Sequence, residues 1–271
     1  MTFQLRSNVK MFIRHRLPRI SAWVIEPWLH RRYQRASARF EEVTNQVIDR
    51  YGLKVHAGPF EGLRYLSEAR NSGFASKILG CYESEISRVV QEIITSDYGI
   101  IVDVGCAEGY YAIGFAVAST RSTIFAFDIQ SDCRALCRQL AELNGVGSRV
   151  VIGSNCGPAE LNKMPQSRVC LVCDCEGFEL ELLDPSKVPA MCGWDILVEL
   201  HDCHRPGITE VINERFCKTH YIELIDSVRR NPAHYPQASF LRSRRDRFIA
   251  VSDLRGSWQQ WAWMRARSPM K

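Results

Sequence analysis

From residue 99 onward, apolar and polar positions follow two alternating patterns. Short, continuous apolar runs bounded by turn residues predict buried strands at 99–105, 122–128, 148–153, 168–174, 194–200, 220–226 and 246–252. Apolar residues that recur every three or four positions predict helices between them, as at 110–119, 131–146 and 209–218. Strands that alternate with helices indicate an α/β protein with a doubly wound sheet of about seven strands. Ligands of such sheets bind at the carboxyl ends of the strands.

Within the helix expected at 131–146, Ser131 is placed to cap the first turn and Asn144-Gly145 to end the last. Residues 82–96 also have helical spacing, and the glycine-rich stretch 51–70 predicts a small hairpin or irregular lead-in. These patterns predict three parts: a helical basic arm and lead-in at 1–75, the α/β domain at 76–255, and a C-terminal tail at 256–271.

Charge is concentrated at the N-terminal end. Residues 1–40 hold nine Lys or Arg and a single acid, Glu26, among bulky apolar side chains. One interpretation is an interfacial helix on an anionic membrane. The interpretation we favour is a helical arm that packs on its own domain or on a partner while its basic side chains stay solvated.

The eleven cysteines do not have the pattern of a disulfide framework. Their number is odd, several stand inside apolar runs, and no secretory segment precedes them, which predicts reduced thiols and a cytoplasmic protein, at most peripheral to the inner face of the membrane. No apolar run approaches the roughly 18 residues of a membrane span.

Candidate chemistry begins in the stretch IVDVGCAEGYYA, residues 101–112, which reads as a strand, a glycine turn and a helix. Glycines permit a tight turn and a close ligand, and the helix start offers free N–H groups. A dinucleotide fingerprint would place glycines at positions 105, 107 and 110, but the chain has Gly105, Ala107 and Tyr110 there. The tyrosine argues against a dinucleotide.

Two acids sharpen this picture. Asp128 ends the next strand, where it can accept two hydrogen bonds from a ribose diol, and Asp103 can hold a cationic amino group directly or through water. A ribose combined with an amino acid favours S-adenosylmethionine over NAD or ATP. The alternative for Asp103 is a simple loop-capping acid.

The stretch VCLVCDCEGFELELL, residues 169–183, ends an apolar run with two acids, Asp174 and Glu176. Strand alternation predicts that these two acids share one side, with Cys173 and Cys175 on the other. The segment DCEGFE resembles the Asp-x-Glu-Gly-Phe-Glu motif of the FkbM family of class I S-adenosylmethionine-dependent methyltransferases, and VELH follows on the next strand. The resemblance spans residues 80–252, and it departs from the family at Ala107, where members often have Asn.

The resemblance implies a Rossmann-like methyltransferase sheet whose last strand is antiparallel, with the methyl donor at the glycine turn. It also implies that Tyr82 and Glu83 cover the donor, although an exposed helix start is an equally good interpretation of that pair. The implied donor-binding set is Asp103, Gly105, Cys106, Ala107, Gly109, Tyr110, Asp128, Ile129, Tyr82 and Glu83.

On the acceptor side, Asp174 and Glu176 are expected to face the hydroxyl that is methylated, and the next strand delivers Glu199, His201 and Asp202 to the same edge. His201 is the first candidate for the base, with Asp174 and Glu176 orienting the ring or holding the acceptor. For Glu176, a favourable place at a helix start is the structural alternative.

The residues at this edge include ligand types for two metals. Mg²⁺ held by Asp174, Glu176, His201 or Asp202 would acidify a hydroxyl, although an obligatory ion is not favoured. Zinc is disfavoured because the spacing of its candidate ligands does not match known zinc sites; those candidates are Cys173, Cys175, His201, Cys203 and His204.

These features together predict O-methylation of a small molecule, sugar or glycolipid. The alternatives are a non-catalytic module that binds the donor or a partner, and a nucleic-acid methyltransferase. The latter is weaker because Cys-Glu-Gly follows the acid of the central strand and because basic and aromatic residues do not interleave outside the arm. Membrane contact through residues 1–40 stays open, as does the oligomeric state.

Overall fold

The computed structural model describes residues 26–69, 73–253 and 259–268, with side chains from residue 37 onward. The chain divides into two compact units, Met1–Gln46 and Val47–Lys271. Helix α3 (Glu26–Tyr51) begins in the first unit and ends in the second. Of the segment 1–40, in which we expect a helical arm, residues 26–40 lie in this helix, and residues 1–25 lie outside the described part of the chain.

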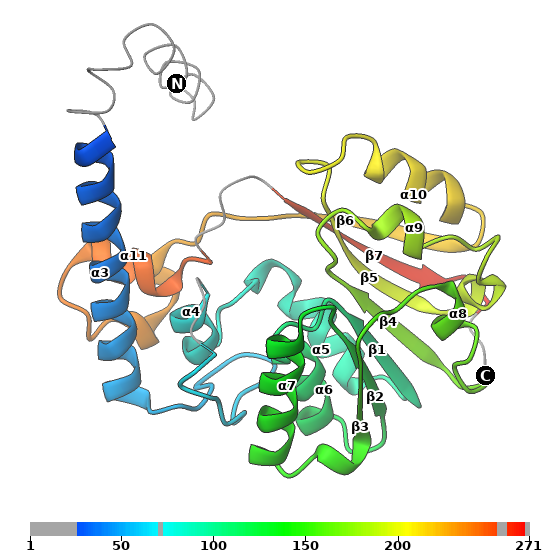
Figure 1. Cartoon of the computed structure of the whole chain (residues 1–271), viewed down its shortest axis with the longest axis horizontal. Helices are drawn as coiled ribbons and strands as arrows, with labels where there is room; N and C mark the ends of the chain where they lie inside the picture. The colour runs from blue at the N-terminus through cyan, green and yellow to red at the C-terminus, as the bar shows by residue number, and fades with distance from the viewer. Residues whose placement is uncertain (1–25, 70–72, 254–258, 269–271) are drawn as a thin grey trace, which may run out of the picture. The chain divides into compact units, whose positions relative to one another are not determined.

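The second unit is built around one seven-stranded sheet of order β3-β2-β1-β4-β5-β7-β6 (Figure 1). Strands β1 to β5 pair in parallel, whereas β7 is antiparallel to both β5 and β6. The strands are β1 (Ile100–Val104), β2 (Thr123–Phe127), β3 (Val150–Gly153), β4 (Val169–Cys173), β5 (Asp195–Leu200), β6 (His220–Asp226) and β7 (Gln260–Ala266). This is the doubly wound, Rossmann-like sheet of seven strands with an antiparallel last strand that the sequence predicts.

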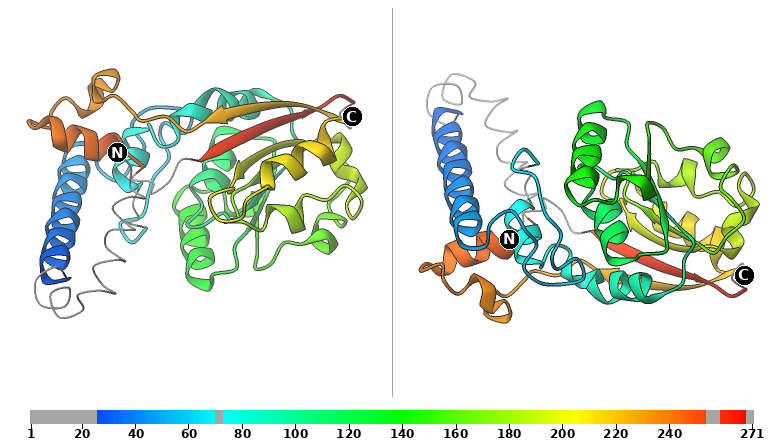
Figure 2. Two further views of the ribbon diagram at one scale, coloured as in Figure 1. Left: turned by 90° about the horizontal axis from the view of Figure 1, so that it is seen from above. Right: turned by 90° about the horizontal axis from the view of Figure 1, so that it is seen from below.

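Helices cover both faces of the sheet (Figures 1 and 2). The crossover helices α6 (Tyr110–Ala118) and α7 (Ser131–Leu143) lie on one face, and α9 (Glu179–Leu182) and α10 (Ile208–Phe216) lie on the other. The remaining helices of this unit are α4 (Phe74–Leu79), α5 (Ser87–Thr95), α8 (Pro158–Leu161) and α11 (Arg244–Val251), with short 3₁₀ turns η2 (Ser84–Ile86), η3 (Gly147–Arg149), η4 (Pro189–Gly193), η5 (Pro232–His234) and η6 (Pro236–Ala238).

Apolar side chains from the central strands form the core on the face of α9 and α10. Alternate residues of β1, β4 and β5, such as Val102, Leu171 and Ile196, pack there against Ile212 and Phe216 of α10. Every residue of β1, β4 and β5 is buried, as expected for parallel strands with both faces covered. The carboxyl ends of these strands are therefore held rigidly.

One strand expectation was wrong. Residues 246–251 belong to α11, and Ser252 is its C-cap. The Ser243 side chain caps the start of this helix by accepting a hydrogen bond from the Asp246 N–H, which favours a helix over a strand. The seventh strand is β7, inside the segment 256–271 that we expected to be a tail. Strand β7 lies between two other strands, and its Trp261 and Trp263 side chains are completely buried; Trp261 packs against Tyr111 of α6.

A second correction concerns the start of α7. Gln130 takes the N-cap position without a side-chain cap, and the Ser131 hydroxyl instead donates to Asp132. The end of the helix follows the expectation, because the backbone N–H groups of Gly145 and Val146 bond back to Glu142 and Ala141. In the described residues, no helix combines the length and apolar character needed to cross a membrane.

Candidate active site

The turn after β1 needs glycine at two positions. Gly105 and Gly109 have φ angles of +85° and +98°, which L side chains rarely adopt. A Cβ on Gly105 would lie 1.7 Å from the carbonyl oxygen of Asp174, and one on Gly109 would lie 2.9 Å from Cys137 Sγ. The glycines therefore bring the turn against the end of β4 and pack the start of α6 against α7.

Asp128 joins this turn to the end of β2. Its Oδ2 accepts a hydrogen bond from the Ala107 N–H (2.9 Å), and its Oδ1 accepts one from the Gln130 N–H (2.8 Å). Each carboxylate oxygen has a second lone pair, so both can still accept from a ligand hydroxyl. The turn, with Ala107 at φ +46°, is thus held in shape before any ligand arrives.

A cavity of about 510 Å³ opens beside this turn at the carboxyl ends of β1, β2, β3 and β4. Gly105, Asp128 and Asp174 line it. Ile129 and Phe178 add apolar surface, and their exposed fractions of 80% and 45% are large for side chains of this kind. The size and the mixture of apolar and polar walls suit a nucleoside-sized ligand.

Asp103 is a buried acid on β1 whose Oδ2 has no hydrogen-bond partner among the described atoms. Burial raises the pKa of this carboxyl to about 8, and the negative charge of Asp174 adds to the effect, while a backbone hydrogen bond from Ala112 opposes it. Asp103 is therefore mostly protonated at pH 7. A cationic group that reached it would favour the carboxylate and release its proton.

His201, completely buried just after β5, lies among four carboxylates. Its Nδ1 is 2.6 Å from Glu179 Oε1. Its Nε2 is 3.5 Å from Asp174 Oδ1, 3.5 Å from Glu176 Oε2 and 3.6 Å from Glu199 Oε2, and it has no hydrogen-bond partner among the described atoms.

Burial lowers the pKa of His201, but the hydrogen bond to Glu179 and the charges of Asp174, Glu179 and Glu176 outweigh it, so the pKa lies above its ordinary value. The imidazole thus has one nitrogen fixed by Glu179 and one directed toward the two acids of the motif. Such a ring can take up a proton at Nε2 once it is neutral.

Asp174 and Glu176 do meet on one side, but through a turn rather than by strand alternation. Strand β4 ends at Cys173, and Glu176 has a left-handed φ of +53°. The two cysteines of the motif lie together as expected, with Cys173 Sγ 3.4 Å from Cys175 Sγ and both packed on the core. Among the described non-glycine residues, positive φ angles occur at Glu83, Ala107 and Glu176, all of which are candidates from the sequence.

A cation could fit beside His201. Asp174, Glu176 and His201 each offer a ligand atom, and these atoms all lie within 4.8 Å of one another. Asp202 is not brought into this group, because its carboxylate accepts from the Gly207 N–H (2.9 Å) and from the backbone and hydroxyl of Thr209, which fixes the start of α10.

Cysteine takes no part in this cation-compatible group within the described chain. Among the candidate zinc ligands, His204 also lies at the site, with Nε2 3.2 Å from Glu176 Oε2. Cys173 instead belongs to the apolar core, and Cys175 packs against that core and also lines the cavity beside Asp128.

Other candidates lie behind the turn rather than in the wall of the cavity. Tyr82 packs edge-on against Tyr110, with 5.4 Å between ring centroids, and Glu83 is buried and accepts a hydrogen bond from Tyr111. The buried Cys106 thiol interacts with Cys137, which together with burial raises its pKa. Of the implied donor-binding set, the cavity wall contains Gly105, Ala107, Asp128 and Ile129.

Sequence reasoning missed several residues of this region. Glu179, which holds His201, is the last acid of the Asp-x-Glu-Gly-Phe-Glu motif, so its position in the motif was the available signal. Ser154 and Asn155 follow β3 at the expected ligand edge and line the cavity. Lys77 forms a buried ion pair with Glu108 of the glycine turn, and no local pattern in the sequence indicates that pairing.

No family model and no curated protein matches the sequence. Solved structures that resemble the chain include a protein assigned as an O-methyltransferase from Klebsiella pneumoniae, with a TM-score of 0.47 and 12% identity over 83% of this chain and 90% of that one. An rRNA methylase from Streptococcus thermophilus has a TM-score of 0.44 and 11% identity over 65% and 92%.

The C-terminal domain of precorrin-6Y C5,15-methyltransferase from Rhodobacter capsulatus has a TM-score of 0.42 and 12% identity over 65% of this chain and 85% of that one. These names cover different substrates, and at this similarity the matches say nothing of the substrate of this chain. The resemblance to the FkbM family rests on the motif alone.

Proposed function

We propose that the protein is an S-adenosylmethionine-dependent methyltransferase that methylates a hydroxyl group of a small molecule, such as a sugar or glycolipid. One observation carries the proposal. Asp174 and Glu176 belong both to the wall of the cavity beside Asp128 and to the group around His201. A nucleoside site and a candidate base therefore adjoin at one edge of the sheet.

The residues present suit the donor. Asp128 can accept from the two ribose hydroxyls, and the apolar surface of Ile129 can cover the purine. Asp103 Oδ2 has no hydrogen-bond partner among the described atoms, and the cationic amino group of the donor can supply one. When bound, the donor supplies an electrophilic methyl group on a sulfonium sulfur.

In the proposed reaction the acceptor oxygen forms a bond to the methyl carbon while the carbon–sulfur bond breaks and its electron pair stays on sulfur. His201 Nε2 takes the hydroxyl proton, which requires the neutral ring. Glu179 fixes the ring through Nδ1, and the carboxylates beside Nε2 stabilise the imidazolium that forms. Asp174 and Glu176 orient the acceptor hydroxyl.

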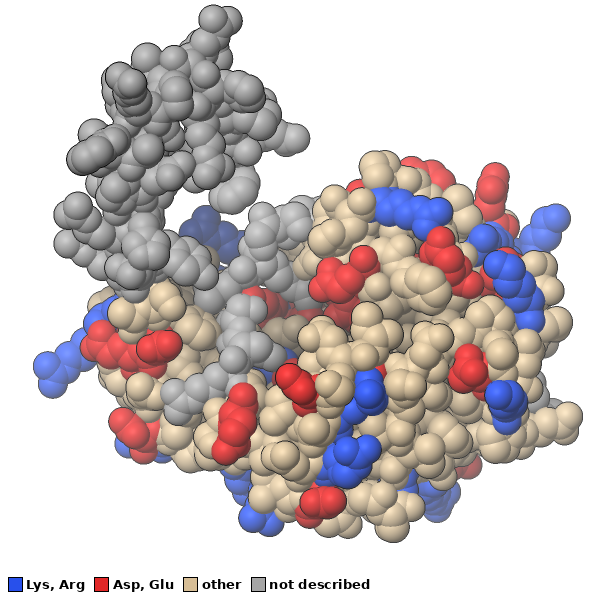
Figure 3. All heavy atoms as spheres, viewed as in Figure 1, with Lys and Arg blue, Asp and Glu red and all other residues tan. Residues whose placement is uncertain are grey.

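A divalent cation is the alternative means of acidifying that hydroxyl, since Asp174, Glu176 and His201 offer oxygen and nitrogen ligands at compatible separations. The coloured part of the face in Figure 3 has acidic and basic side chains interspersed, without a continuous basic band. The face in this view therefore offers no continuous track of cations for a nucleic-acid strand.

The proposal is tested first by calorimetric titration with S-adenosylmethionine, in chelator and again in Mg²⁺. Asp128→Ala should weaken donor binding at least about tenfold, since it removes charge-assisted hydrogen bonds. Asp132→Ala, which removes an exposed acid nearby on α7, is the matched control and should leave binding unchanged. Equal affinity of all three proteins, or no binding by folded protein, would refute the donor site.

Transfer is tested next by incubating the enzyme with a panel of hydroxylated acceptors and detecting methylated product and S-adenosylhomocysteine by mass spectrometry. Product that forms in chelator supports His201 as the base, and product that requires Mg²⁺ supports the cation. Donor binding without turnover across a wide panel would favour the non-catalytic alternative. Turnover on RNA alone would contradict the small-molecule acceptor.

A further inference from the structure

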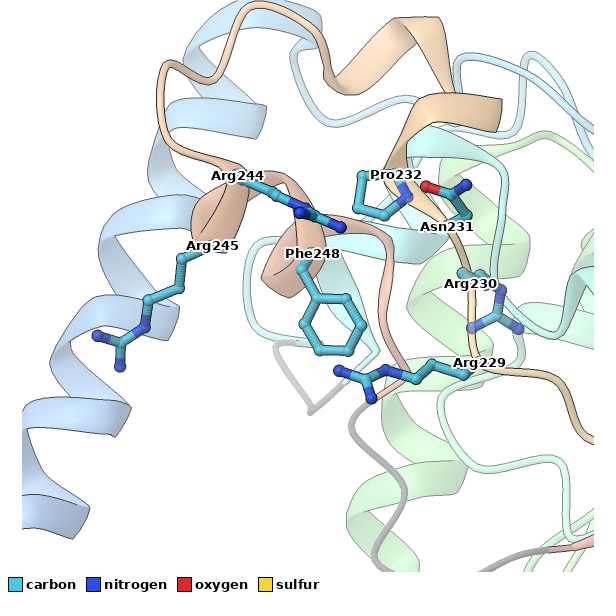
Figure 4. Close-up of a pocket in the computed structure, with 7 residues that line it drawn as sticks. All are labelled: Arg229, Arg230, Asn231, Pro232, Arg244, Arg245 and Phe248. Carbon is cyan, nitrogen blue, oxygen red and sulfur yellow. The ribbon is translucent and has the colours of Figure 1, made fainter.

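A second cavity, of about 620 Å³, lies between the segment that follows β6 and helix α11 (Figure 4). It is lined by Arg229, Arg230, Asn231, Pro232, Arg244, Arg245 and Phe248. Residues 229–248 contain six arginines and a single acid, Asp246, which is buried. The cavity is thus strongly basic, and it shares no lining residue with the cavity beside Asp128.

One of its arginines is already neutralised. Arg230 is buried and paired with Glu85 Oε2 (2.8 Å) and Asp253 Oδ2 (2.5 Å), so it anchors the wall rather than serving a ligand. Arg229, Arg244 and Arg245 are exposed. Within the described residues, none of these three lies at ion-pair distance from a carboxylate.

The groups that face the cavity are arranged around Phe248. The Arg229 guanidinium lies 4.7 Å from the centroid of the Phe248 ring, a cation–π contact that fixes its direction. Arg244 extends from α11 toward Pro232 on the opposite wall, from which Arg229 extends toward Phe248, whereas Arg245 extends away (Figure 4). Asn231 Oδ1 accepts from the Ala233 N–H, which leaves the Asn231 NH₂ group to donate.

This arrangement matches one chemical class. Guanidinium groups present paired N–H donors with the geometry of a phosphate or carboxylate, and two of them from opposite sides, with a third raising the local potential, suit a dianion. The volume is in the range of small-molecule sites. The chain's own residues 1–40, with nine basic side chains and one acid, do not have the complementary charge.

We propose that this pocket binds the phosphate group of a small phosphorylated molecule. Arg229 and Arg244 hold the phosphate oxygens, Asn231 donates a further hydrogen bond, and Phe248 contacts the carbon part of the ligand. A single concave site with one aromatic ring differs from the extended track of cations and stacked rings that binds a nucleic-acid strand. The proposal is independent of the methyl donor.

The test is a calorimetric titration of the full chain with glycerol phosphate at physiological salt, with glycerol as the uncharged analogue. We expect saturable binding of glycerol phosphate, weaker binding of inorganic phosphate and none of glycerol. Arg244→Gln should weaken binding about tenfold, because it removes charge-assisted hydrogen bonds. Arg138→Gln, which removes an exposed arginine from α7, loses the same charge elsewhere and should change the affinity less than twofold.

The experiment separates this proposal from general basicity and from a polymeric phosphate. Equal weakening by Arg244→Gln and Arg138→Gln would overturn it, because only the overall charge would then matter. So would the absence of saturable binding by folded protein. Binding of an oligonucleotide or of anionic vesicles without any binding of glycerol phosphate would also overturn it, and would assign the arginines to a macromolecular surface.

Discussion

Two buried carboxylates close to the glycine turn behave in opposite ways. Asp103, on β1, has its pKa raised to about 8 by burial and by the charge of Asp174. For Glu108, in the turn, burial also acts to raise the pKa, but the charge and hydrogen bond of Lys77 and the hydrogen bond of Tyr65 lower it below its ordinary value. The difference is a buried cation, which one acid has and the other lacks.

The same contrast separates two wider regions. Away from the sheet edge, buried cations meet buried acids, as in the pairs Lys77–Glu108 behind the turn and Arg230–Asp253 in the wall of the second cavity. At the sheet edge, four carboxylates lie within 3.6 Å of a nitrogen of one imidazole, His201. The first region is electrically balanced and supports the fold. The second carries surplus negative charge, and a ligand with positive charge would relieve it.

The largest expected effect lies at the edge. His201→Gln should lower kcat by about 10² to 10⁴, the usual contribution of a general base, while the donor Kd changes less than about threefold. Single-turnover rates and calorimetry give the two quantities. His204→Gln is the matched control, since His204 also contacts Glu176 but is half exposed. Equal losses of kcat in the two variants would show that His201 is not the general base.

Behind the turn, Lys77→Met should lower the free energy of unfolding by about 3–5 kcal/mol, because it leaves Glu108 charged and buried without its cation. Urea denaturation measures this. Arg121→Met, which breaks an exposed pair with Asp97, should cost less than about 1 kcal/mol. A double variant Lys77→Met/Glu108→Gln that is no more stable than Lys77→Met would contradict the explanation.

The raised pKa of Asp103 predicts how many protons are released when the donor binds. Near pH 7 its carboxyl is mostly protonated because its pKa is about 8, and a donor ammonium group would lower that pKa, so binding should release up to about one proton. Calorimetry in buffers of different ionisation enthalpy measures the release. Asp103→Asn should abolish this proton release and weaken donor binding. Unchanged proton release in that variant would show that the donor amino group binds elsewhere.

The smallest expected effect is a shift of the pH profile. The raised pKa of His201 places the rise in kcat, which needs the neutral ring, above the ordinary histidine range near pH 6.5. Glu179→Gln removes the carboxylate that stabilises the imidazolium through Nδ1 and should move that rise to lower pH. An unmoved profile would show that Glu179 does not act through His201.

The parallel strands could be predicted because each is a continuous apolar run ended by a turn, as in Ile100–Val104 and Val169–Cys173. Strand β7 was not predicted, because only its pairing with β5 and β6 in the folded sheet shows that this segment, with its two buried tryptophans, is a strand. The segment 246–252 has the composition of a strand, and the cap at Ser243 decides for a helix. Such choices depend on packing and capping rather than on apolar pattern alone.

The candidate site also has features that the sequence pattern predicts and features that depend on packing. Strand ends predict that Asp103, Asp128, Asp174 and His201 gather at one edge, because parallel strands share their direction. The hydrogen bond of Glu179 to His201 and the use of Asp202 to hold α10 could not be predicted, because both depend on how turns of several residues close.

The place of β7 also constrains how the protein can be made. In the finished sheet β6 pairs with β7 alone, and β5 has β7 as its outer neighbour. Until residues 260–266 leave the ribosome, β5 therefore presents an open, hydrophobic edge to other chains, and β6 has nothing to pair with. The sheet can therefore close only after every other strand has been made, and a nascent chain halted before β7 would be a target for chaperones.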